Sequence, residues 1–139
     1  MKTIFAALTL LVSVSANALE YKELVGTWNI IATSGDSTCA AVVPGAIDAN
    51  MWLISVAADG VVNVVVQGNT SFPQLEGTVS ADNGVLILES AGFSVSSWFK
   101  LTGVDSKAMV GLKRVTARNG NKAGVGPCFV EYKLEAKKQ

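Results

Sequence analysis

The sequence predicts an all-β protein, an eight-stranded antiparallel barrel whose strands run up and down in chain order. Turn signals recur at short intervals, and β-branched or aromatic residues fill the runs between them. After the N-terminal segment, no stretch shows helical periodicity apart from a short turn near residues 44–50. Half of the residues are hydrophobic and only 16% are charged, so the chain can bury one good core as a single domain.

The first eighteen residues are expected to be an export signal and not part of the fold. Lys2 supplies a positive charge, and residues 4–14 form an apolar core that is too short to cross a bilayer. Residues 16–18 have the small-x-small pattern that a signal peptidase cuts. Cleavage after Ala18 would leave residues 19–139 as one β-barrel domain, periplasmic or secreted and without a membrane anchor.

The first four strands are predicted at residues 25–34, 50–57, 61–67 and 75–80. Asp59-Gly60 separates the second from the third, and Gln67-Gly68-Asn69 separates the third from the fourth. The first run opens with Gly26-Thr27-Trp28. In a closed barrel, a Trp packed across the floor plugs the end of the barrel, and a Gly beside it lets the backbone pass close.

The last four strands are predicted at residues 85–90, 93–102, 106–117 and 127–135. Turn signals at residues 82–84, 103–105 and 119–121 bound them. Because successive side chains in a strand point to opposite faces, one face of each strand lines the interior. The expected lining is apolar and comprises Trp28, Ile30, Ala32, Leu75, Val79, Phe93, Val95, Ser97, Phe99, Leu101, Val130, Tyr132 and Leu134.

The connections alternate in length, which predicts a cup. The links at residues 35–49, 68–74 and 118–126 are long, whereas the others are tight turns or short links. In an up-and-down meander, odd and even links lie at opposite ends of the barrel. One end is therefore expected to be closed, with Trp28 near it, and the apolar residues 40–49 are expected to act as a lid at the other.

Cys39 and Cys128 are expected to form a disulfide, because a cysteine pair in an exported protein is most often oxidised. If the last strand pairs with the first, both cysteines fall at the open rim, where a bridge is geometrically reasonable. A metal site or a reactive thiol is the competing interpretation. It lacks support, since the chain has no His and no Cys-x-x-Cys spacing.

Two adjacent cations interrupt the apolar pattern of the seventh strand. Either Lys113 or Arg114 must point inward, unless a bulge intervenes or the side chain faces the rim. An inward cation would be a counter-charge for a ligand carboxylate or another acidic head group. The expected ligand-binding residues are Trp52, Phe93, Val95, Phe99, Lys113, Arg114 and Tyr132.

These features together resemble the lipocalins and the wider calycin group of small β-barrels. The resemblance rests on Gly26-x-Trp28, the eight meandering strands and the long first loop with its cysteine, and it covers residues 20–136. Lipocalins usually carry an Arg near the end of the last strand that packs on the Trp, where this chain offers Lys133 or Lys137. The resemblance implies a protein that carries or sequesters a small apolar molecule.

A second resemblance implies a different function. Residues 23–28 followed by a Cys are similar to the start of the periplasmic inhibitors of secreted alkaline metalloproteases, although the second Cys here lies far downstream. Those inhibitors share the eight-stranded barrel and block the protease with an N-terminal tail, which here would be residues 19–23. A protease is therefore the alternative partner.

Composition argues against other classes of function. Without His there is no Ser-His or Cys-His arrangement and no imidazole metal site, so we expect no enzyme, no metal and no cofactor. Removing Lys2 from the eleven basic residues leaves ten against eleven acidic ones, a net charge of about −1. This balance gives no electrostatic case for nucleic acid or for an anionic membrane surface.

One outward-facing apolar patch predicts self-association as a homodimer. The patch is expected if Val62, Val64 and Val66 point inward. The alternative is that a one-residue shift in a short strand exchanges its inward and outward faces. The residues of the patch are Val61, Val65, Leu86, Leu88 and Trp98.

Overall fold

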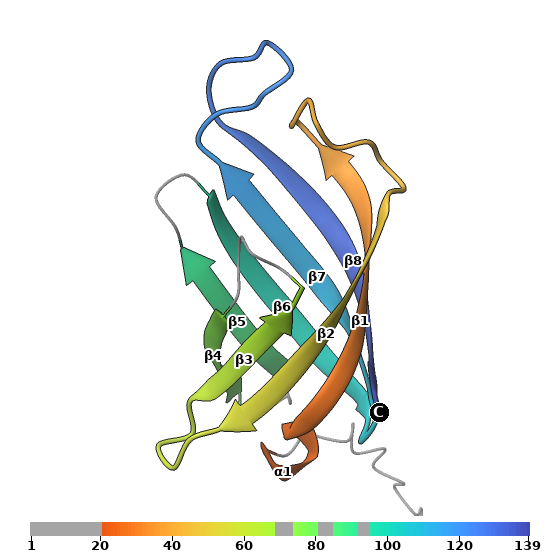
Figure 1. Ribbon diagram of the computed structural model, residues 1–139, viewed down its shortest axis with the longest axis vertical. Coiled ribbons are helices and arrows are strands. Elements are labelled where there is room, and N and C mark those ends of the chain that lie inside the picture. The colour runs from red at the N-terminus through yellow and green to blue at the C-terminus, as the bar shows by residue number, and fades with distance from the viewer. Residues whose placement is uncertain (1–20, 69–73, 81–84, 92–94) are drawn as a thin grey trace, which may run out of the picture.

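The computed structural model describes residues 21–68, 74–80, 85–91 and 95–139. Its eight strands form a closed antiparallel barrel in chain order, so the predicted fold class is confirmed (Figure 1). The described elements are a short helix α1 (Tyr21–Leu24) and the strands β1 (Gly26–Ser37), β2 (Ile47–Val56), β3 (Val62–Gln67), β4 (Gln74–Ser80), β5 (Val85–Ala91), β6 (Val95–Asp105), β7 (Ala108–Ala117) and β8 (Cys128–Lys138).

All eight predicted strands are present, and the largest shifts are at the ends of β1, β2, β6 and β8. The β1–β2 hairpin is longer than predicted, because β1 continues to Ser37 and β2 begins at Ile47. The short turn expected near residues 44–50 is therefore wrong for residues 47–50, which are strand. Strand β8 continues to Lys138, because it stays paired with β1 as far as Trp28.

The two ends of the barrel differ as predicted. The β2–β3 and β6–β7 turns, at residues 57–61 and 106–107, lie at one end together with α1 (Figure 1). The loops at residues 38–46 and 118–127 rise from the opposite end. The β3–β4 and β5–β6 connections fall almost entirely outside the described residues.

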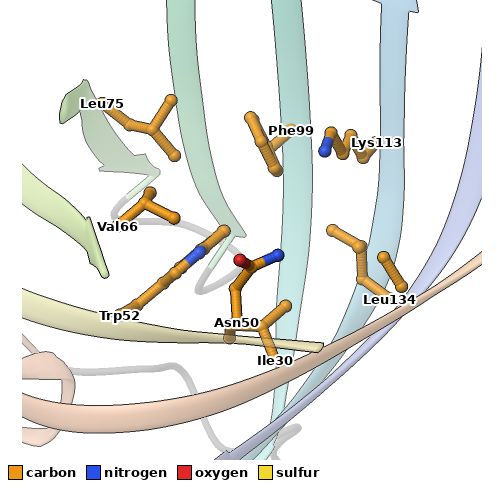
Figure 2. Close-up of a pocket in the computed structure, with 9 residues that line it drawn as sticks. Ile30, Asn50, Trp52, Val66, Leu75, Phe99, Lys113 and Leu134 are labelled. Carbon is orange, nitrogen blue, oxygen red and sulfur yellow. The ribbon is translucent and has the colours of Figure 1, made fainter. Parts of the chain in front are cut away.

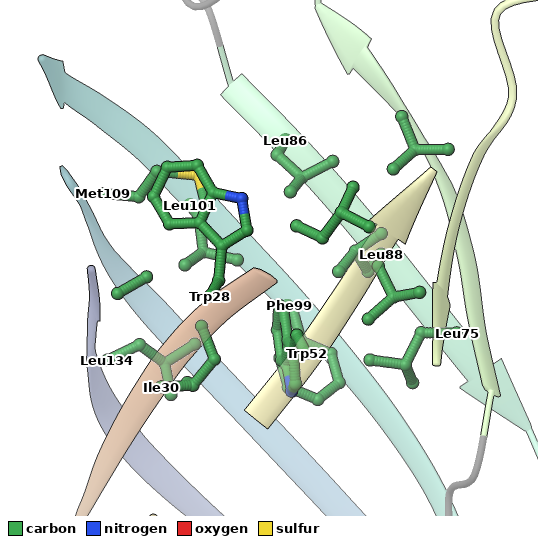
Figure 3. Packing of buried hydrophobic residues seen from close by; sticks show 14 of the residues in the cluster. Trp28, Ile30, Trp52, Leu75, Leu86, Leu88, Phe99, Leu101, Met109 and Leu134 are labelled. Carbon is green, nitrogen blue, oxygen red and sulfur yellow. The ribbon is translucent and has the colours of Figure 1, made fainter. Parts of the chain in front are cut away.

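Trp28 fills the closed end of the barrel, as the sequence predicts. Its side chain is fully buried, and the indole Nε1 donates a hydrogen bond of 2.8 Å to the carbonyl oxygen of Leu24. Leu24 is itself fully buried, so α1 covers the floor from below. Figure 3 shows the Trp28 ring beside Met109 and Leu101, and these residues belong to one continuous apolar core.

Gly26 is needed beside this Trp. Its φ is +137°, and a Cβ there would lie 3.0 Å from the Cε of Lys138. The Nζ of Lys138 donates to the carbonyl oxygen of Glu23 at 2.8 Å and lies 5.9 Å from the Trp28 ring centroid. The cation over the Trp is thus Lys138 and not the predicted Lys133 or Lys137, because β8 extends beyond its predicted end.

The alternation of inward and outward side chains is as predicted on most strands but not on β5. Leu86 and Leu88 are fully buried, so the outward patch that included them is wrong. A one-residue error in a short strand moves every side chain to the other face. Val65 and Trp98 do face outward, with 44% and 38% of their surface exposed. The expected lining residues that the structure describes are buried or half-buried, and Phe93 lies outside the described residues.

Gly111 of β7 lies where the backbone of β6 leaves no room for a side chain. A Cβ at this position would collide with the carbonyl of Lys100 and lie 2.8 Å from the Cα of Leu101. Both neighbours are backbone, so the strands themselves would have to move. Gly111→Ala is expected to lower the free energy of unfolding by about 3 kcal/mol, at the upper end of the cost of overpacking.

Urea unfolding measures this loss, and Gly35→Ala is the matched control. A Cβ at Gly35 would lie 3.6 Å from the carbonyl oxygen of Glu131, an ordinary contact. Gly35→Ala is therefore expected to lower the free energy of unfolding by less than about 1 kcal/mol. Equal losses for the two variants would show that β6 and β7 have room at Gly111.

Candidate functional site

The adjacent cations on β7 point in opposite directions. Pairing with β6 and with β8 is continuous around Lys113 and Arg114, without a bulge. Lys113 faces the interior and is half-buried, whereas Arg114 is exposed on the outer surface. The Arg114 guanidinium lies 4.2 Å from the Phe129 ring centroid, and its Nε is 3.9 Å from the Glu131 carboxylate. Arg114 is therefore not an interior residue, because strand alternation admits only one of the pair.

The Lys113 ammonium lies among aromatic rings. Its Nζ is 5.3 Å from the Phe99 ring centroid and 5.0 Å from that of Tyr132. Such contacts favour the charged amine. Within the described part of the chain, Lys113 has no ion pair. The interior therefore contains one cation that lacks a direct anionic partner.

Burial lowers the pKa of Lys113, because desolvation penalises its charged form, and the negative charge of Asp48 opposes this effect. Burial raises the pKa of Tyr132, and Asp48 raises it further. Asp48 is exposed and accepts a hydrogen bond of 3.0 Å from the Asn50 amide. It acts on both groups from the β2 side of the barrel.

A small pocket lies inside the barrel, lined by side chains from β1, β2, β3, β4, β6, β7 and β8 (Figure 2). Trp52 and Phe99 form its aromatic wall in an edge-to-face arrangement, with centroids 5.3 Å apart and planes at 75°. The volume in this pocket that the centre of a water molecule can occupy is only about 20 Å³, so the pocket has room for about one water. The lining residues are Ile30, Ala32, Asn50, Trp52, Val66, Leu75, Phe99, Lys113 and Leu134.

The structure brings part of the predicted ligand site together. Trp52, Phe99 and Lys113 line the pocket, and Tyr132 joins them through its contact with Lys113. Val95 is half-buried and packs against the core without lining this pocket. Asn50 was missed, although it precedes Trp52 by two residues and alternation places both on one face.

Cys39 and Cys128 form the predicted disulfide, with Cα atoms 5.0 Å apart. Backbone hydrogen bonds accompany it: the Thr38 N–H donates to Phe129, and the Ala40 N–H donates to Gly120, both at 2.9 Å. The β1–β2 loop is therefore fastened to the β7–β8 loop at the open rim.

The predicted lid, residues 40–49, is a fixed rim in this structure. Residues 47–49 belong to β2, and buried Ser34 of β1 holds the rest through four hydrogen bonds. The Ser34 hydroxyl donates to the carbonyl oxygen of Val43 at 2.7 Å and accepts from the Ala46 N–H at 2.9 Å. The backbone of Ser34 bonds to Gly45 and Ala46. The loop thus packs on its own strand.

Among residues 21–68, 74–80, 85–91 and 95–139, no three His, Cys, Asp or Glu side chains gather as a metal ion would require. No helix in those ranges is both long and apolar enough to cross a membrane.

The fold and the site together define a closed eight-stranded up-and-down barrel in which the cation Lys113 lines an interior pocket. No family model matches the sequence, and no curated protein matches it at a significant level. A redesigned β-barrel is similar in structure, with a TM-score of 0.57 and 13% identity over 90% of this chain and 99% of that one. An S-type phycobiliprotein lyase of Guillardia theta has a TM-score of 0.46 and 10% identity over 86% of this chain and 90% of that one. The first likeness shows the fold alone.

Proposed function

We propose that this protein is a lipocalin-like barrel that carries or sequesters a small, largely apolar molecule with an acidic head group. The observation that carries the proposal is Lys113, an interior cation without an ion pair among the described residues, at the wall of an apolar pocket. A buried charge is costly unless it is paired, and a ligand carboxylate would supply the partner. The proposal is one of binding and not of catalysis.

The pocket limits the size of the ligand. Toward the closed end, Trp28, Leu101 and Met109 fill the barrel (Figure 3). Trp52 and Phe99 narrow the pocket from the side. Because the pocket has room for about one water, a ligand must displace side chains of the lining. Lys113 and Asn50 are the two polar residues of the lining, so a short acyl chain fits this arrangement better than a long one.

Export is part of the proposal. The Cys39–Cys128 disulfide is consistent with an oxidising compartment outside the cytoplasm. The signal peptide and its cleavage site after Ala18 lie outside the described residues. A periplasmic or secreted protein of this kind would meet its ligand in the same compartment.

The alternative, inhibition of a protease through the N-terminal segment, gains no support from the described part of that segment. Residues 21–24 form α1, Leu24 is buried, and its carbonyl oxygen accepts the bond from Trp28. Lys138 binds the carbonyl oxygen of Glu23. A segment fastened in this way has to detach before it can enter a protease cleft.

A series of straight-chain carboxylates tests the proposed ligand class by calorimetry. Affinity is expected to rise about fourfold for each methylene from butanoate to hexanoate, since a buried methylene contributes about 0.8 kcal/mol. It is expected to stop rising at longer chains, because the floor is filled. Absence of binding for every carboxylate and for a retinoid probe would contradict the carrier function.

Lys113→Met is expected to weaken hexanoate binding at least about tenfold, because a hydrogen bond to a charged group contributes about 1.5–3 kcal/mol. Binding of hexanol, which has no charge, should not change. Arg114→Met is the matched control, since the neighbouring cation faces outward, and it should leave both ligands unaffected. Equal loss in the two variants would remove Lys113 from the proposed site.

The pH dependence follows from the lowered pKa of Lys113. A lysine with a lowered pKa loses its charge at a lower pH than an exposed lysine does. Hexanoate affinity is therefore expected to fall as pH rises through that lowered pKa, below the ordinary value of 10.5, while hexanol affinity stays flat. Titration of both ligands in the wild type and in Lys113→Met measures this, and the variant should show no such fall.

A further inference from the structure

Three large aliphatic side chains protrude at the open end of the barrel. Among the described residues, Ile47, Val43 and Val125 are the most exposed large hydrophobics, at 73%, 71% and 71%. Val43 and Ile47 belong to the β1–β2 hairpin and Val125 to the β7–β8 loop, which rise from the same end (Figure 1). Exposed apolar surface that is gathered in one place marks a contact with another protein or with a membrane.

The composition of these loops is unusual for surface connections, which are ordinarily polar. Residues 40–47 read Ala-Ala-Val-Val-Pro-Gly-Ala-Ile, and residues 123–127 read Ala-Gly-Val-Gly-Pro. Residues 38–47 and 118–127 contain two basic residues, Arg118 and Lys122, and no carboxylate. Asp36 and Asp48 flank the first loop. Lys122 is in the same loop as Val125, so its ammonium can meet an anionic head group beside that tip.

The loops also bond much of their own backbone. The Asn121 side chain accepts from the N–H groups of Ala123 and Val125, both at 3.1 Å, and Ser34 holds the other loop as described above. Backbone groups that enter an apolar medium must be paired within the protein. The N–H groups paired in this way belong to Ala40, Val42, Gly45, Ala46, Asn121, Ala123, Gly124 and Val125.

We propose that Val43, Ile47 and Val125 insert into the interfacial region of a lipid bilayer, with the Lys122 ammonium at head-group level. The Cys39–Cys128 disulfide joins the loops, so one docking event engages both tips. This contact is separate from the proposed interior site and does not depend on it.

Co-sedimentation of the disulfide-bonded protein with vesicles tests the proposal without any ligand. Vesicles of phosphatidylcholine, with and without phosphatidylglycerol, should both bind the protein, and the anionic ones should bind it better. Val43→Asp and Val125→Asp are each expected to lower the partition coefficient at least about tenfold. Val104→Asp is the matched control, because Val104 is 56% exposed but lies near the β6–β7 turn at the closed end. It should bind like the wild type.

Lys122→Glu separates the two contributions. It should weaken binding to the anionic vesicles, most strongly at low salt, and change binding to phosphatidylcholine little. A fluorescent reporter, Val43→Trp, should shift to the blue and be quenched by brominated lipid, whereas Val104→Trp should not. Circular dichroism checks that each variant is folded.

Three results would overturn the proposal. Wild-type protein that sediments with neither vesicle type has no lipid contact. Losses in Val104→Asp as large as those in Val43→Asp would show that the open-end loops are not the docking surface. A dimer that forms without vesicles and is lost in Val43→Asp would assign these tips to contact between two copies of the chain.

Discussion

Replacing Trp28 with Ala is expected to lower the free energy of unfolding by about 3–5 kcal/mol, the range for a large aromatic removed from a core. The side chain is fully buried, and Leu101 and Met109 pack on it (Figure 3). Because these neighbours are themselves held in the core, removing the ring leaves a cavity that they do not fill. The substitution also leaves the carbonyl oxygen of Leu24 without its hydrogen bond from the indole. Both losses fall at the closed end, where α1 should detach.

Urea unfolding of Trp28→Ala measures the loss, with Trp98→Ala as the matched control. Trp98 is on the outer wall and 38% exposed. Its replacement by Ala is expected to lower the free energy of unfolding by about 1 kcal/mol or less. Hydrogen exchange at residues 21–24 should accelerate in the first variant only. A loss below about 1 kcal/mol for Trp28→Ala would mean that the ring does not support the barrel floor.

Local signals in the sequence were sufficient to predict the barrel. Turn residues mark hairpins by the backbone conformations they favour, and alternation assigns a face to each side chain, so neither needs a distant contact. The place of Trp28 followed from the Gly26-Thr27-Trp28 opening and the alternating lengths of the connections. The Cys39–Cys128 bridge followed from the expected export, and pairing of the last strand with the first made it geometrically reasonable. Strand ends were less predictable, because β8 reaches Lys138 through pairing with both β1 and β7, and the order of residues along β8 does not signal this.

The candidate site was predictable in kind but not in detail. Two adjacent cations on one strand require that one faces inward, yet the choice between Lys113 and Arg114 depends on the register of β7 against β6 and β8. The free volume of the interior depends on how side chains from all strands pack together. For that reason, an apolar lining did not reveal that the pocket beside Lys113 has room for only about one water. The buried face of β5 was likewise undetermined, because a run of aliphatic residues does not alternate.

Removing the disulfide is expected to have an effect as large as that of Trp28→Ala. The bridge joins residues separated by 89 positions, and closing so long a loop restricts the unfolded chain by about 4–5 kcal/mol in loop-closure entropy. The folded state keeps other ties between the same loops, including the bonds from Thr38 to Phe129 and from Ala40 to Gly120. The barrel of the Cys39→Ser/Cys128→Ser variant should therefore still form, with lower stability.

Urea unfolding of this double variant, beside the oxidised wild type, should show the full loss. Reduced wild type is the matched control and should unfold at the same urea concentration as the variant. Hydrogen exchange should accelerate at residues 38–46 and 118–127, where the bridge holds the rim, and change little around Trp28. A loss below about 1 kcal/mol would mean that the unfolded chain already keeps the two loops close, so that the crosslink removes little of its entropy. Faster exchange at the rim without that loss would assign the disulfide to shaping the open end, the region that the lipid surface is proposed to meet.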